Sequence, residues 1–260
     1  MAEESPYKPF YSVLVLAFFC SLLVAGAAVG LRPLQLENQL EDRRKNILLA
    51  AGLYDSSKSI DEMFANIEIR IIELSTGEFV PPEVISPEDY DQRKAPMTAD
   101  MGESIPDPND EAGLGMLEKY SLVYLVQEEG EISQIVLPIR GKGLWSTLYG
   151  YIAIGNDLTT INGISFYEHG ETPGLGGEIE NPRWQADWQG KKIYDQEYQE
   201  TLTIGKAPGG KEEIHQIDGL SGATLTTNGV DDIINFWFGG DYGFKPFLTQ
   251  MKEEGGELNG

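Results

Sequence analysis

The chain has 260 residues, 41% of them hydrophobic, and a formal net charge of -23 from 42 acidic and 19 basic residues. This length and apolar content permit one good-sized domain or two small ones, and they exclude wholesale disorder. The negative charge would repel a phosphate backbone, which argues against nucleic-acid binding. It is compatible with cation attraction, with salty surroundings or with simple solubility.

The cysteine and histidine content excludes most metal-centred redox chemistry. Cys20 is the only cysteine, and His169 and His215 are the only histidines. A single cysteine cannot form an intramolecular disulfide, and these three residues cannot build a Cys-ligated iron–sulfur cluster or a closed zinc site. We therefore predict no metal site. Any redox work must depend on an organic cofactor.

The first predicted element is a transmembrane helix over residues 10–31, preceded by a short tail of residues 1–9. The run FYSVLVLAFFCSLLVAGAAVGL carries no charge, and as a helix it would be about 33 Å long, enough to cross a bilayer core of about 30 Å. A cleaved signal peptide is the alternative, because residues 25–27 (AGA) resemble a cleavage site. The run is longer than a typical signal-peptide core, and Glu3 and Glu4 precede it, so we favour an uncleaved anchor.

Charge does not decide the orientation of this anchor. Lys8 precedes it, whereas several basic residues follow it closely: Arg32, Arg43, Arg44 and Lys45. The positive-inside rule would leave the large domain in the cytoplasm, but the rule weakens for long downstream domains.

Residues 32–54 show a helical pattern, with apolar positions at Leu36, Leu40 and 47–49. They predict a juxtamembrane helix ending near Gly52, which would either dock on a partner or pack on its own domain. Residues 55–115 follow, and they are acidic and, from residue 81, rich in proline. With few apolar residues to bury, this segment is interpreted as a surface excursion of the soluble domain.

Residues 116–260 have the pattern of a folded domain. Short β-branched or aromatic runs cover residues 120–127, 132–140, 149–154 and 161–168, separated by turn residues. Val230, Ile233, Ile234 and Trp237 then follow the spacing of an amphipathic helix. We predict an α+β fold in which a mainly antiparallel sheet with hairpins is flanked by helices.

The most informative segment is DGLSGAT at residues 218–224, which precedes that helix. Four hydroxyl side chains crowd the helix entry: Ser221, Thr224, Thr226 and Thr227. Small residues such as Gly222 and Ala223 allow close backbone approach to a ligand. The free amides and the positive end of the helix dipole favour a phosphate, which a threonine could bind or esterify. The alternative is a plain N-cap, the usual role of Ser and Thr before a helix.

Two further segments could line a ligand site. The loop HGETPGLGG at residues 169–177 has glycines and Pro173, which predict a tight backbone able to lie against a flat ligand, with Leu175 as its apolar face. We interpret Glu171 as structural or as a hydrogen-bond acceptor; an ordinary loop is the alternative. In RGKGLW at residues 140–145, Trp145 could stack on a ring or be a core residue.

These motifs resemble a known family. DGLSGAT matches D-x-x-S/T-G-A-T, the signature of covalent flavinylation in FMN-binding domains of ion-pumping respiratory complexes. The loop at 169–177 is similar to the E-T-P-G-L-G loop of those domains, and RGKGLW is similar to a segment that lines their isoalloxazine pocket. LENQLEDRRKNILLAAGL, the acidic excursion and NFWFGGDYGFKPFL resemble the C subunit of the sodium-pumping NADH:quinone oxidoreductases. The resemblance covers almost the whole chain and is loosest over residues 55–115.

The resemblance implies a site and a cofactor. FMN would be esterified to Thr224 by a flavin transferase that uses FAD and magnesium, and Asp218 would belong to the flavinylation motif. Lys206 could offset the phosphodiester charge, although a lone lysine is more often a solvated surface residue. The other residues implied in cofactor binding are Trp145, Glu171, Thr172, Gly174, Leu175, Gly176, Ser221, Gly222, Ala223, Leu225 and Thr226.

The resemblance also implies a function. The chain would be a single-pass protein of the bacterial inner membrane with its large domain in the periplasm. It would relay electrons on the way from NADH to quinone, next to the B, D and E subunits of a six-subunit sodium pump. One alternative is the G subunit of the Rnf complex, with the same covalent FMN. A second is a membrane-anchored binding or scaffold domain without redox activity.

Overall fold

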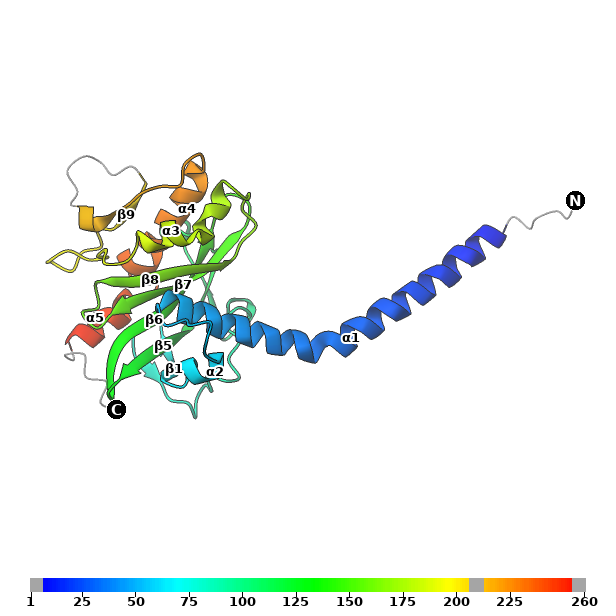
Figure 1. Ribbon diagram of the computed structural model, residues 1–260, viewed down its shortest axis with the longest axis horizontal. Helices are drawn as coiled ribbons and strands as arrows, with labels where there is room; N and C mark the ends of the chain where they lie inside the picture. Colours follow the sequence, from blue (N-terminus) through cyan, green and yellow to red (C-terminus); the bar gives the residue numbers. More distant parts are fainter. Residues whose placement is uncertain (1–6, 206–212, 254–260) are drawn as a thin grey trace, which may run out of the picture. The chain divides into compact units, whose positions relative to one another are not determined.

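A six-stranded antiparallel sheet forms the core of the computed structural model, which describes residues 7–205 and 213–253 (Figure 1). The strand order is β2-β1-β5-β6-β7-β8. The strands are β1 (Ile67–Glu73), β2 (Phe79–Val80), β5 (Tyr120–Glu128), β6 (Glu131–Lys142), β7 (Thr147–Gly155) and β8 (Ile161–Glu168). Neighbouring strands pair antiparallel throughout, so the predicted antiparallel sheet is confirmed. The four strands predicted from sequence correspond to β5–β8.

The strands alternate their side chains between two apolar layers, as the period-2 geometry of a strand requires. On one face, Val123, Leu137 and Ile152 belong to a core cluster that includes residues of the C-terminal helices. On the other face, Leu122 and Val136 pack in a second cluster. Both faces are covered, which explains the uninterrupted runs of buried residues within β5, β6 and β7.

Helices cover the first face. They are α4 (Thr224–Ile234), which continues into a π-helical turn (Asn235–Gly239), and α5 (Lys245–Glu253). The apolar positions predicted for an amphipathic helix, including Val230 and Ile233, are fully buried. The smaller elements between residues 116 and 217 are β4 (Met116–Glu118), η3 (Gly176–Glu180), α3 (Pro182–Ala186), β9 (Thr203–Ile204), η4 (Glu213–His215) and β10 (Gln216–Ile217).

The other face packs against α2 (Ile60–Phe64) and the last residues of α1 (Lys8–Ala50). Ile47 and Leu48 are fully buried there. The helix ends with a Schellman motif, in which Leu53 N–H donates to Leu48 C=O and Gly52 N–H donates to Leu49 C=O. Gly52 has φ +69°, a left-handed conformation that glycine adopts without strain. The predicted helix end near Gly52 follows from this residue.

The described part of the chain divides into two compact units, with the boundary between Arg44 and Lys45. In the described part of the first unit, α1 is one continuous helix with Pro33 inside it. Among the described residues, it is the helix that is long and apolar enough to cross a membrane, with a mean hydropathy of 2.5 in its most apolar window. This finding supports the predicted N-terminal anchor by length and composition.

Part of the predicted excursion lies in the sheet. β1, within residues 55–115, pairs with β2 on one side and with β5 on the other. Its sequence IEIRIIE largely alternates apolar and polar residues, as a strand does. This strand was not predicted, because the segment around it is acidic on average. The rest of the segment contains only short elements: η1 (Ala95–Met97), β3 (Gly102–Ser104) and η2 (Asp107–Asn109).

A buried ion pair connects this segment to the sheet. Glu118 is fully buried, and Arg140 donates to its Oε2 atom. Gln92, from the excursion, donates from Nε2 to the Glu118 Oε1 atom at 2.8 Å and accepts the Leu122 N–H at 3.0 Å. Because every charge in this network has a polar partner, burial of the carboxylate is tolerated.

We predict that Arg140→Met destabilises the domain by about 3–5 kcal/mol, because it leaves the Glu118 carboxylate buried and unpaired. Lys94→Met is the control: it breaks an ion pair with Asp91 in which the lysine side chain is 83% exposed, and it should cost less than about 1 kcal/mol. Urea unfolding of the full chain in detergent, followed by tryptophan fluorescence, measures both. Equal losses would contradict a special role for the buried pair.

Candidate functional site

Three segments that are far apart in sequence meet at the side chain of Glu171. One of its oxygens, Oε1, accepts the backbone N–H of Trp145 at 2.9 Å and of Ser146 at 3.4 Å. The other, Oε2, accepts the hydroxyl of Thr226 at 2.6 Å. One carboxylate thus joins the turn between β6 and β7, the loop at residues 169–177 and the first turn of α4.

The RGKGLW motif begins in the last three residues of β6 and continues into the β6–β7 turn as far as Trp145. The turn closes through a hydrogen bond from Gly143 N–H to Ser146 C=O at 2.8 Å. Ser146 also connects to the second loop, because its hydroxyl oxygen accepts the Gly170 N–H at 2.6 Å. Ser146 was not predicted from the sequence. It follows directly after the motif, and nothing there distinguishes it from an ordinary turn serine.

The 169–177 loop is built around Thr172, whose carbonyl accepts the N–H groups of Leu175 and Gly177. Gly174 has φ +76° with open space around it, so glycine is there for its backbone conformation. Thr172 and Leu175 are exposed at the tip of the loop. The Glu171 N–H donates to His169 Nδ1 at 3.1 Å, which orders the base of the loop.

The entry of α4 is not a plain N-cap. The capping position is Ala223, which has no hydroxyl, and the helix has no side-chain cap. Thr224 follows at the first helical position and is exposed, as is Ser221. Gly222, at φ +75°, reverses the backbone ahead of the helix. The capping alternative raised from sequence is therefore wrong for Thr224, because its hydroxyl lies one residue too late to cap.

The four hydroxyls at this entry have different environments. Thr226 and Thr227 are buried, and each makes a hydrogen bond within the fold: Thr226 donates to Glu171, and Thr227 accepts the Leu220 N–H at 3.0 Å. Ser221 and Thr224 face solvent. The sequence alone cannot distinguish between these groups, since all four fall in one short polar stretch.

Two motif glycines lie closely against the carboxylate. A Cβ atom on Gly143 would lie 2.7 Å from Glu171 Oε1, and one on Gly176 would lie 2.8 Å from Glu171 Oε2 and 2.4 Å from Thr226 Oγ1. Real Cβ atoms are not found so close to such neighbours. The sequence interpretation assigned the glycines of the 169–177 loop to contact with a flat ligand; at Gly176 the close neighbour is the protein itself.

Glu171 remains ionised in its buried position. The residue is only 5% exposed. Burial by itself raises the pKa of this carboxyl, but the hydrogen bonds from Thr226 and from the amides of Trp145, Ser146 and Leu144 outweigh it and hold the pKa below the ordinary value of 4.5. Among the described residues, no lysine or arginine forms an ion pair with it.

Apolar side chains are exposed on all three segments. Trp145 is 70% exposed and Leu225 is 60% exposed, and Leu144 and Leu175 are also partly exposed. The alternative of Trp145 as a core residue is therefore wrong. Leu175 Cδ2 would lie 3.3 Å from a Cβ on Gly222, so the loop tip and the α4 entry are adjacent.

The remaining predicted residues differ in how directly they belong to this site. The Asp218 side chain is exposed, while its carbonyl accepts the indole N–H of Trp184 at 2.8 Å and thereby secures the start of the motif. Ala223 is buried. Lys206 lies outside the described residues.

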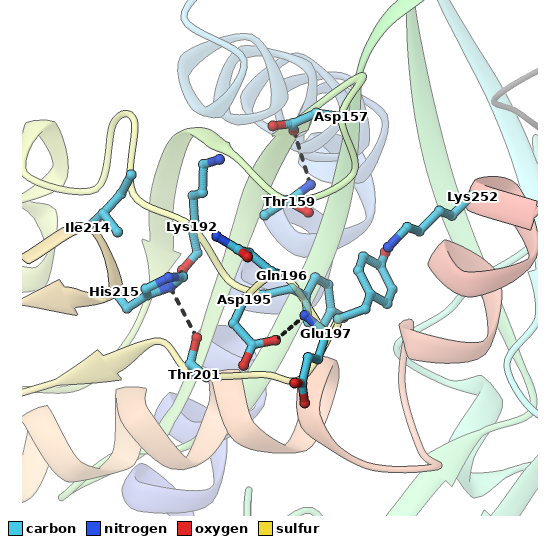
Figure 2. A pocket seen from close by; sticks show the side chains of 12 residues that line it. Asp157, Thr159, Lys192, Asp195, Gln196, Glu197, Thr201, Ile214, His215 and Lys252 are labelled. Atoms are coloured by element: carbon cyan, nitrogen blue, oxygen red, sulfur yellow. Dashed lines mark hydrogen bonds between the residues drawn. The ribbon is translucent and has the colours of Figure 1, made fainter. Parts of the chain in front are cut away.

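A cleft of about 690 Å³ lies elsewhere in the domain (Figure 2). Its lining includes Lys192, Asp195, Glu197, His215 and Lys252, and it contains none of the residues predicted for cofactor binding. The Thr201 hydroxyl and His215 Nδ1 lie 3.0 Å apart in it. Acidic and basic side chains are mixed in this lining, so it defines no single class of ligand.

Part of the chain matches a known domain family. Residues 143–239 match the FMN-binding domain family, a range that contains the β6–β7 turn from Gly143, the 169–177 loop and α4. The chain therefore contains an FMN-binding domain, and an N-terminal helix that is suited to span a membrane precedes it in the sequence.

Relatives over nearly the full length identify the family. The chain is 42% identical to the C subunit of the Na(+)-translocating NADH-quinone reductase of Pseudomonas aeruginosa, over 96% of this chain and 98% of that protein. It is 45% identical to the C subunit of the Neisseria meningitidis enzyme, over 94% of each. The chain belongs to the family of C subunits of Na(+)-translocating NADH-quinone reductase, and it is thus a subunit of an oxidoreductase complex. These relatives favour this family over the alternative of a Rnf G subunit.

Solved structures agree with the fold. The crystal structure of Shewanella oneidensis NqrC superposes with a TM-score of 0.72 at 33% identity, covering 83% of this chain and 99% of that one. The crystal structure of the C subunit from Parabacteroides distasonis superposes with a TM-score of 0.65 at 28% identity, covering 84% of this chain and 97% of that one. The predicted fold class is confirmed.

We predict that Gly176→Ala disturbs the site, whereas Gly174→Ala does not. The new methyl group at 176 would clash with Thr226 Oγ1 and Glu171 Oε2 and should cost about 1–3 kcal/mol. At 174 the space is open and only the positive φ opposes alanine, which costs about 1 kcal/mol. Hydrogen exchange at the amides of Trp145 and Ser146 should accelerate in the first variant alone. Equal acceleration in both would refute the steric explanation.

We predict that the hydrogen bonds of Glu171 weaken at acidic pH. Since the pKa of Glu171 is lowered in the folded state, its hydrogen bonds contribute stability that is present above the ordinary value of 4.5 and is lost as pH falls through the lower folded pKa. Exchange protection of the Trp145 and Ser146 amides, corrected for intrinsic rates, should therefore fall in this acid range. Glu171→Gln, which cannot titrate, should lack the transition. A transition of the same size in that variant would assign it to another group.

Proposed function

We propose that Thr224 carries FMN through a phosphoester bond and that the chain relays electrons within a sodium-pumping NADH:quinone oxidoreductase. The observation that carries this proposal is the exposed Thr224 hydroxyl at the start of a helix whose first turn has no side-chain cap. The match of residues 218–224 to the flavinylation signature supports it, as does membership of the C-subunit family.

The entry of α4 fits a phosphate. Thr224, Leu225 and Thr226 occupy the first helical positions, where backbone N–H groups have no carbonyl partner within the helix. These amides and the positive end of the helix dipole stabilise an anion. A side-chain cap would compete for the same N–H groups, and none is present at this helix.

The exposed apolar side chains fit a flat ring. Trp145 could stack on the isoalloxazine of FMN, with Leu144, Leu175 and Leu225 as further apolar surface. When bound, FMN would supply the redox chemistry that the chain's own side chains lack. We propose that the remaining members of the site shape the loop and the motif around it: Glu171, Thr172, Gly174, Gly176, Asp218, Ser221, Gly222 and Ala223. Lys206 is proposed to offset the phosphodiester charge.

Attachment is a phosphoryl-group transfer from FAD, with a flavin transferase and magnesium. The Thr224 oxygen forms a bond to the phosphorus of the FMN half while the pyrophosphate bond of FAD breaks. AMP leaves, and the hydroxyl proton passes to a base or to solvent. The product keeps one negative charge, which the amides at the start of α4 can stabilise.

The covalent bond serves retention of the cofactor. We propose that α1 anchors the chain in the bacterial inner membrane and that the large domain is periplasmic, where no free FMN pool would replace a lost cofactor. The attached flavin would receive electrons from a membrane iron centre and pass them to the flavin of the B subunit. The D and E subunits are the other proposed neighbours. α1 has no charged residue between residues 10 and 31, so we do not propose an ion path through it.

The test of this proposal is a substitution at the acceptor. After co-expression with a flavin transferase, wild-type protein should give a fluorescent band on a denaturing gel and the mass of one FMN adduct. Thr224→Val should give neither, while its stability changes by less than about 0.5 kcal/mol, because the Thr224 side chain is exposed.

Thr98→Val is the matched control, since Thr98 is also exposed but lies outside the motif. It should keep the full adduct. A dark wild-type band, or an adduct that persists in Thr224→Val, would overturn the proposed attachment.

A further inference from the structure

Two buried carboxylates in the described domain have contrasting environments. Glu118 is paired with the guanidinium of Arg140, the usual way to stabilise a buried charge. Glu171 instead accepts hydrogen bonds from uncharged groups of the described chain: backbone amides and the Thr226 hydroxyl. A buried carboxylate without a cation carries a desolvation cost that simple packing would avoid. The position of Glu171 therefore points to a role that depends on its particular geometry.

That geometry is a bridge between the segments that carry the proposed cofactor site. Oε1 fixes the turn that presents Trp145, and Oε2 fixes Thr226, which is two residues after the proposed acceptor Thr224. The glycines at 143 and 176 leave the room that the two oxygens need. The hydrogen bond from Thr226 to Glu171 ties the first turn of α4 to the loop.

We propose that Glu171 is a positioning residue that orders the acceptor threonine and the Trp145 turn before the flavin is attached, an inference that rests on the proposed function. The carboxylate does not touch the reacting atoms. It holds the first turn of α4 from its buried side through Thr226, which leaves the free amides and the Thr224 hydroxyl facing outward. The same contact withdraws the Thr226 hydroxyl from competing as an acceptor.

The hydrogen bonds of Glu171 should raise the rate at which FMN is attached. An acceptor hydroxyl held in one orientation reacts faster than one on a mobile turn, because the ordering entropy has already been lost. Without the bridge, the first turn of α4 and the Trp145 turn would each lose a charge-assisted hydrogen bond, the stronger type of hydrogen bond. Attachment should then slow while the sheet and the buried part of α4 stay folded.

The experiment uses the full chain in detergent with flavin transferase, FAD and magnesium. Glu171→Ala removes the whole bridge, and Thr226→Val removes only its helix side with little change in shape. Intact mass gives the initial rate of FMN attachment, and hydrogen exchange reports the amides of Trp145 and Ser146 before modification. We expect attachment to slow about tenfold or more in both variants, with exchange about tenfold faster in Glu171→Ala.

Conservative variants separate positioning from general stability. Thr226→Ser keeps the hydroxyl and should restore the wild-type rate. Glu171→Gln can offer its oxygen to the two amides and its amino group to the Thr226 oxygen, so it should restore most of the rate. Glu131→Gln, which removes an exposed carboxylate at the start of β6, should match wild type.

Each outcome is decisive. Wild-type rates in both Glu171→Ala and Thr226→Val would overturn the proposal, as would slow attachment that occurs only together with loss of near-UV circular dichroism. If wild-type protein acquires no FMN, the proposed function fails. The exchange measurement on unmodified protein then still decides whether Glu171 orders these segments.

Discussion

The hydrogen bonds that converge on the Glu171 carboxylate hold the candidate site together. They join a strand-to-strand turn, a glycine-rich loop and a helix entry, none of which is near the others in sequence. Because the carboxylate is buried and pairs with no lysine or arginine of the described chain, its donors must stay in place to stabilise its charge. The tight spacing at Gly143 and Gly176 is the steric counterpart of the same constraint. Together they set the shape of the site through contacts within the chain.

Near this carboxylate, the fold places four chemically similar hydroxyl groups in two different environments. Thr226 and Thr227 are turned inward and make hydrogen bonds, whereas Ser221 and Thr224 remain open. The helix that follows begins without a side-chain cap, an arrangement that leaves its first amides open to an anion. An apolar rim that includes Trp145 completes an environment with a place for a phosphate and a place for a ring. The match of this region to the FMN-binding domain family is consistent with that division.

The sheet supports the site from a distance. β6 and β7 are long, and their turn lies beyond the strand ends, where Trp145 can be exposed. α4 packs on β6 through residues such as Ile233, which is 2.3 Å from where a Cβ on Gly141 would be. The indole N–H of Trp237 donates to the Arg140 carbonyl at 2.8 Å and fixes the end of the same helical region to that strand. The body of α4 and the end of β6 are thus held together by core contacts that do not involve Glu171. Loss of the carboxylate should therefore change local order at the site and leave the fold in place.

Sequence alone determined the strongly periodic parts of this protein. Local patterns account for the four strands from β5 to β8, the amphipathic positions of α4 and the apolar run of α1. The end of α1 at Ala50, just before Gly52, follows from the freedom of glycine at positive φ. The motifs also indicated the family and the cofactor class. Only the tertiary structure decided that β1 pairs into the sheet, that Trp145 is exposed and that Thr224 is open while Thr226 is engaged. These features depend on contacts between residues far apart in the chain, such as Glu171 and Thr226, which are 55 positions apart, and no local propensity encodes them.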